Sequence, residues 1–153
     1  MILALDISTS ALGWSVWNGS DYHWGIQSFT KYNKDYGSLF LSYRQWLEEM
    51  IQDNTPEVIS MEASYNNMKG ASGYLLSSMN AITHMVAFEQ DITRYEYAVP
   101  TIKKFITGSG RASKEEMIEA IQKRGFEVND DNEADALGVM FLTQFNLNKE
   151  KGE

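Results

Sequence analysis

The sequence predicts an α/β domain: a mixed sheet, made of a three-strand meander and two parallel strands, flanked by helices. Three observations favour this fold class. An apolar run at the start of the chain precedes two segments of alternating apolar and polar residues. Two later short strand patterns each follow a helical pattern, and three helical patterns close the chain. A meander followed by strand–helix units is typical of a mixed sheet with helices packed on it.

The first half of the chain predicts three strands, a helix and a fourth strand. Residues 2–7 have the composition of a buried strand, and the alternating segments 13–19 and 22–29 continue it as a hairpin. Apolar residues then recur at helical spacing over 38–52. The apolar run 57–63 predicts a second buried strand, which ends in an acid.

The second half of the chain begins with a long helix. Its apolar residues recur at helical spacing from Tyr74 to about residue 90. A short strand over 94–100 follows, and we expect Pro100 to stop it. The segment 101–110 predicts a short helix that is ended by glycines.

Two further helices are predicted from their capping residues. Ser113 and Glu116 form a capping box, and Gly125 lies near the end of that helix. Asp130 or Asp131 caps the last helix. We expect that helix to present one apolar face, made of Ala134, Leu137, Phe141 and Phe145.

Length and composition indicate one ordinary globular domain. We predict that it covers residues 1–147 and that residues 148–153 form a frayed tail. Cysteine is absent, which excludes disulfides and thiolate metal sites. No apolar run has the length of a membrane span, so we expect a cytoplasmic protein without a membrane partner. The net charge of −8 argues against non-specific nucleic-acid binding and suits a site built from carboxylates.

Three acids stand out by position. Asp6 interrupts the first strand, Glu62 closes the strand after the first helix, and Asp135 lies in the final helix. If the two strands are parallel neighbours, Asp6 and Glu62 lie close together, and a cation must neutralise them or one must hold a proton. Oxygen ligands select Mg²⁺ or Mn²⁺. The alternative interpretation is structural, because acids at strand ends and helix caps are common.

The final helix offers a fourth group to this site. Asp131 and Asn132 lie four and three residues before Asp135, on its face of the helix. We expect Gly138, one turn later, to let the helix approach the sheet closely.

Four segments resemble the RuvC-like Holliday-junction resolvases of the RNase H-like superfamily. They are "LALDISTSALGWSVW", "VISMEASY", "IKKFITGSGRASKEEM" and "NEADALGVMF". They occur in the family's order and cover roughly residues 1–145. The resemblance implies an RNase H-like fold and a metal-dependent endonuclease of four-way or other branched DNA. The small size and divergent spacing look more like bacteriophage resolvases.

The resemblance also implies roles for individual residues. Asp6, Glu62 and Asp135 match three of four metal ligands, and Asn132 occupies the fourth position, where Asp131 is the alternative. These residues would hold two Mg²⁺ or Mn²⁺ ions, with Asp6 bridging them. The implied DNA contacts are Tyr65, Lys103, Lys104, Arg111 and Lys114, of which Lys114 is also assigned to catalysis.

Symmetric cleavage of a junction implies a homodimer. The candidate interface is the helix 74–90, where Met79, Met85 and Phe88 are available. These residues could equally belong to the core, and we expect this of Met79 and Met85. We interpret His23 and His84 as structural residues.

Two other classes of function are compatible with the sequence. A non-catalytic module that binds branched DNA would explain Asn132, since an amide brings no charge to a metal. An actin-like or sugar-kinase phosphotransferase fragment would explain the opening "LALDISTS", although the second phosphate loop of that class is missing. A nuclease of the same fold that prefers other branched or flapped DNA is a third possibility.

Overall fold

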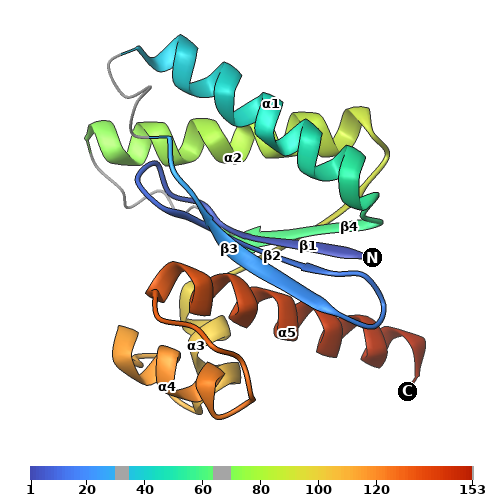
Figure 1. Cartoon of the computed structure of the whole chain (residues 1–153), viewed down its shortest axis with the longest axis vertical. Coiled ribbons are helices and arrows are strands. Elements are labelled where there is room, and N and C mark those ends of the chain that lie inside the picture. The colour runs from blue at the N-terminus through green and yellow to red at the C-terminus, as the bar shows by residue number, and fades with distance from the viewer. Residues whose placement is uncertain (30–34, 64–69, 153) are drawn as a thin grey trace.

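The computed structural model describes residues 1–29, 35–63 and 70–152 and has the predicted order of elements (Figure 1). The strands are β1 (Ile2–Asp6), β2 (Leu12–Trp17), β3 (Tyr22–Gln27), β4 (Val58–Glu62) and β5 (Thr93–Tyr97). The helices are α1 (Tyr36–Asn54), α2 (Ala71–Glu89), α3 (Val99–Thr107), α4 (Lys114–Gln122) and α5 (Asp131–Lys151).

The five strands form one mixed sheet in the order β3-β2-β1-β4-β5. β1, β2 and β3 pair antiparallel, while β4 pairs in parallel with both β1 and β5. The predicted meander and the parallel neighbours β1 and β4 are therefore confirmed. In Figure 1, α1 and α2 cover one face of the sheet, and α5, backed by α3 and α4, covers the other.

Alternation along the central strands assigns each side chain to one of these two layers. Leu3 and Leu5 of β1 pack in the core under α1 and α2. Ile2 and Ala4 pack on the α5 side. Asp6 continues the second series, and in β4 the same argument places Glu62 on the α5 side after Val58. Both acids therefore face α5.

α5 reaches the sheet closely because β2 has a glycine where the two elements meet. A Cβ atom on Gly13 would lie 2.0 Å from the backbone oxygen of Asn132. The prediction that Gly138 provides this close approach is wrong. A Cβ atom there would contact Ile102 of α3 at 3.1 Å and Met117 of α4 at 3.2 Å, so Gly138 faces the outer helices.

Several helix details differ from the sequence predictions. β5 ends at Tyr97, and Pro100 lies in the first turn of α3, where its missing N–H costs nothing. α5 extends through Lys151, into the stretch 148–153 that we predicted as a frayed tail, because lysines in its last turn and Gly152 suit a helix C-terminus. Phe145 is 53% exposed rather than part of a buried face.

The methionines of α2 divide between core and surface. Met79 is fully buried, as expected. The prediction that Met85 belongs to the core is wrong, since its side chain is 49% exposed.

Within the described residues, no helix combines the length and the apolar composition that a membrane span requires.

Candidate metal centre

Three elements bring the predicted acids to one edge of the sheet. The parallel register pairs Leu5 with Met61, so the next residues, Asp6 and Glu62, end neighbouring strands side by side. α5 crosses the same face and contributes Asp135 from its second turn. Residues far apart in the sequence therefore meet where β1 and β4 end.

Burial and mutual repulsion raise the pKa values of all three carboxyl groups. The pKa of Asp6 is raised well above 3.8, first by burial and then by the charges of Glu62 and Asp135. Burial, followed by the charge of Asp135, raises the pKa of Glu62 from 4.5 to about 7. Burial raises the pKa of Asp135 from 3.8 to about 6, although the charge of Lys103 opposes this.

The same carboxylates lack hydrogen-bond donors. Within residues 1–29, 35–63 and 70–152, no group donates a hydrogen bond to Asp6, Glu62 or Asp135. Partly buried carboxylates without donors are stabilised either by a bound cation or by taking up a proton. Within the described ranges, no three His, Cys, Asp or Glu side chains are placed so that they could already hold one metal ion together. The carboxylates therefore lie near one another without forming a complete coordination sphere. An all-oxygen set of this kind fits Mg²⁺ or Mn²⁺.

The first turn of α5 separates three consecutive polar residues into different roles. Asp130 is the N-cap, and its Oδ1 accepts hydrogen bonds from the backbone nitrogen of Asn132 at 2.8 Å and from its Nδ2 at 2.9 Å. Asp131 forms an ion pair with Lys114, the first residue of α4. Asn132 lies over Gly13, which is the register partner of Asp6.

Two of the predicted basic residues approach the acids. Lys103 of α3 is partly buried, and its charge lowers the pKa values of Glu62 and Asp135. Its Nζ donates to the backbone oxygen of Ala112 at 2.8 Å, which ties the loop between α3 and α4 to the site. Lys114 is exposed, and its charge acts on Asp6 and Asp135 as well as on Asp131.

The other predicted contacts are less closely tied to the acids. Lys104 and Arg111 are exposed on α3 and on the following loop. Tyr65 lies outside the described residues, so its predicted contact with DNA bases stays a prediction. His84 Nε2 pairs with Glu96 Oε1 at 2.5 Å, and His23 is exposed on β3. Neither histidine is therefore a candidate ligand of the metal centre.

Sequence reasoning missed two residues of the centre. The sequence predicts Asp130 only as a cap, and the signal for its second hydrogen bond, from the Asn132 side chain, is its spacing of two residues from an asparagine. Gly13 is the second residue, and a glycine inside a strand is a signal of close approach by another backbone.

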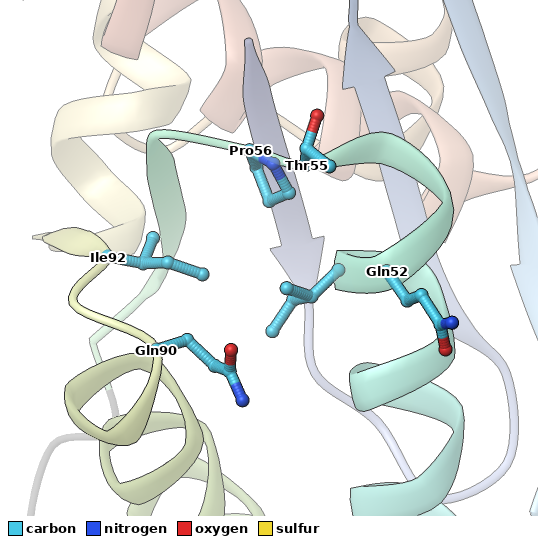
Figure 2. Close-up of a pocket in the computed structure, with 6 residues that line it drawn as sticks. Gln52, Thr55, Pro56, Gln90 and Ile92 are labelled. Carbon is cyan, nitrogen blue, oxygen red and sulfur yellow. The ribbon is translucent and has the colours of Figure 1, made fainter.

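A hollow at the other edge of the sheet is separate from this centre. It lies between the C-terminal ends of α1 and α2, and Figure 2 shows its side chains. They are Ile51, Gln52, Thr55, Pro56, Gln90 and Ile92, none of which is charged. The strands β1 and β4 begin at that edge and carry their acids at the opposite one.

Comparisons with known proteins agree with this architecture. The chain is 27% identical to the crossover junction endodeoxyribonuclease RuvC of Ruegeria pomeroyi over 143 residues, which cover 90% of this chain and 87% of that protein. The RuvC of Gluconobacter oxydans is 27% identical over 95 residues, or 61% of this chain and 56% of that protein. The structure of Thermus thermophilus RuvC in complex with a Holliday-junction substrate superimposes with a TM-score of 0.73 at 17% identity, covering 90% of this chain and 88% of that chain.

Because the sequence identity is low, the structural likeness shows a shared fold and nothing further. The family model described as crossover junction endodeoxyribonuclease RuvC matches residues 29–142, which is well over half of the chain. This match removes the support for a phosphotransferase fragment. The chain belongs to the RuvC family of crossover junction endodeoxyribonucleases.

Proposed function

We propose that this chain is a divalent-metal-dependent endonuclease that hydrolyses phosphodiester bonds in branched DNA, with the four-way junction as its main substrate. The observation that carries the proposal is the meeting of three partly buried carboxylates without donors at the ends of β1 and β4 and on α5. Membership of the RuvC family and the fold shared with a junction-bound RuvC support the choice of substrate.

Asp6, Glu62, Asp135 and Asn132 would hold the metal, with Mg²⁺ or Mn²⁺ as the ion and two ions as the expected number. Bound divalent ions activate a water molecule for attack on a phosphate and stabilise the leaving oxygen. Asp6 is close enough to Glu62 on the neighbouring strand and to Asp135 on the helix for both charges to raise its pKa, which suits the expected bridging role.

The basic residues would serve the phosphate. Lys114 and Lys103 lie where their charges act on the acidic groups, so they can stabilise the negative charge that develops on the phosphate during attack. Lys104 and Arg111 extend this positive region along α3 and the following loop. We assign all four to DNA binding, and Tyr65 to contacts with bases at the branch point.

A homodimer would place two such centres on one junction. α2 leaves Tyr74, Met85 and Phe88 exposed by 56%, 49% and 79%. Exposed Ala81 lies seven residues after Tyr74 and four before Met85, so these side chains share one stripe of the helix. A stripe of this kind on a solvent-facing helix suits a two-fold interface.

Cleavage of a synthetic four-way junction, compared with linear duplex of the same sequence, tests the proposal. With Mg²⁺ or Mn²⁺ we expect the wild type to cut the junction preferentially, and EDTA to stop cutting. Asp6→Asn should lower the cleavage rate by at least about 100-fold while junction binding persists, because an oxyanion ligand to the metals is lost.

Asp53→Asn is the matched control, since it neutralises an exposed acid at the far end of α1. It should cut like the wild type. Wild-type cleavage by Asp6→Asn would remove the nuclease assignment. Metal-independent junction binding without cleavage by the wild type would instead identify a non-catalytic module, the alternative that Asn132 favours.

A further inference from the structure

We propose that Asp130 is a positioning residue that turns the amide of Asn132 so that its Oδ1 serves as the fourth metal ligand. In the same arrangement Asp131 serves Lys114 and is not a ligand. This inference rests on the proposed function, because it concerns the same metal centre. It decides between Asn132 and Asp131, which lie on the same side of the helix.

The hydrogen bonds of Asp130 determine which way the amide faces. Asp130 Oδ1 accepts from the backbone nitrogen of Asn132 at 2.8 Å and from Nδ2 at 2.9 Å. An ionised carboxylate can only accept hydrogen bonds, so the amide group must direct its nitrogen towards Asp130. The carbonyl oxygen then points the other way, and no described residue donates a hydrogen bond to it.

The backbone position of Asn132 brings its side-chain oxygen close to the proposed metal ligands. Its carbonyl and Cβ lie against Gly13, the register partner of Asp6. Its side chain also leaves α5 three residues before Asp135, on the same face of the helix. The neutral amide thus sits beside the residues proposed as carboxylate ligands.

Asp131 has a different partner. Its Oδ2 is paired with the ammonium group of Lys114, which opens α4. A carboxylate in that position holds the lysine near the acids and is not free to bind a cation without releasing it. The ligand set then carries three negative charges and one amide dipole.

Binding of Mn²⁺ to the whole protein without DNA, measured by isothermal titration calorimetry, tests the assignment. Asp130→Ser keeps a residue that can cap α5 but shortens the side chain that orients the amide. We expect it to weaken Mn²⁺ binding about tenfold, the usual cost of losing an outer partner of a metal ligand. Asn132→Ala should weaken binding at least as much, and more than Asp131→Asn does.

A double-mutant cycle separates orientation from a merely structural role of Asp130. In an Asn132→Asp background the ligand has two equivalent oxygens and needs no turning. Asp130→Ser should therefore cost no further Mn²⁺ affinity in that background. An equal tenfold loss in both backgrounds, or no loss in either, would overturn the proposal.

Two further outcomes identify what has failed. A larger loss with Asp131→Asn than with Asn132→Ala would assign the fourth ligand to Asp131. Asp6→Asn should abolish Mn²⁺ binding whatever orients Asn132. Wild-type Mn²⁺ affinity in Asp6→Asn would contradict the metal centre itself, and the present inference with it. If Asp6→Asn abolishes Mn²⁺ binding as expected but Asp130→Ser binds Mn²⁺ like the wild type, the present inference alone is contradicted.

Discussion

Gly13 shows how one position without a side chain determines the geometry of the centre. Its place on β2 is opposite Asp6, and the backbone oxygen of Asn132 occupies the space where a Cβ atom would lie. The atom in the way belongs to the backbone of a buried helix, so no side-chain rotation can relieve the contact. Whatever displaces α5 here also displaces Asn132 and Asp135.

Gly13→Ala should therefore damage both stability and metal binding. We expect a loss of about 1–3 kcal/mol in the free energy of unfolding, typical of an overpacked contact. Differential scanning calorimetry should show a midpoint several degrees lower, and Mn²⁺ titration should show weaker binding. Gly37→Ala is the control, because its Cβ would meet only Asp35 at 3.6 Å. Equal behaviour of the two variants would mean that α5 yields at Gly13 without cost.

At the residue scale, the sequence predicted which acids meet at the centre but not which partner each residue at the start of α5 would have. Asp6 and Glu62 could be recognised because each is a charged residue in a buried strand pattern. The roles of Asp130, Asp131 and Asn132 could not be separated, because neighbouring residues at a helix start differ only in which partners they reach. Those partners, Lys114 and Gly13, come from distant parts of the chain.

At the scale of elements, α2 has two faces with different tasks. Met79 and Val86 are buried against the sheet and α1, while the stripe of Tyr74, Ala81, Met85 and Phe88 faces solvent. We expect this stripe to pair with its copy across a two-fold axis.

Phe88→Glu should convert the proposed dimer into a monomer, because it would bury two like charges at the proposed interface. Sedimentation velocity measures this directly, and the fold should be retained since Phe88 is 79% exposed. Leu41→Glu is the matched control: Leu41 is 70% exposed but lies on α1, and its variant should remain dimeric. Dissociation by Leu41→Glu alone would place the interface on α1 instead.

The order of elements followed from periodicity, whereas the packing of α5 did not. Its first half is buried on nearly every side, with Ala136, Gly138 and Val139 inaccessible in addition to the predicted Ala134 and Leu137. The reason is that α5 lies between the sheet and the pair α3 and α4, as Figure 1 shows. A helix enclosed on both sides has no single apolar face, so an amphipathic pattern describes it poorly.

At the scale of the whole molecule, the acidic centre makes metal-free stability depend on pH. Glu62 and Asp135 have folded-state pKa values of about 7 and about 6, against ordinary values of 4.5 and 3.8. Between these values the folded chain binds more protons than the unfolded chain. The free energy of unfolding therefore falls as pH rises through this range, and above about pH 7 the penalty is complete.

Thermal unfolding in EDTA should show this dependence as a midpoint several degrees lower at about pH 8 than at about pH 5.5. The displacement for Glu62 alone, from 4.5 to about 7, corresponds to roughly 3 kcal/mol in total, of which roughly 2 kcal/mol falls between pH 5.5 and pH 8. Mg²⁺ or Mn²⁺ should restore the midpoint at the higher pH, since a ligand that binds only the folded state stabilises it. Asp6→Asn removes one repelling charge, so it should raise the metal-free midpoint at pH 8 and abolish the response to metal. A metal-free midpoint that rises from pH 5.5 to pH 8 and ignores both cations would show that these acids do not form one site.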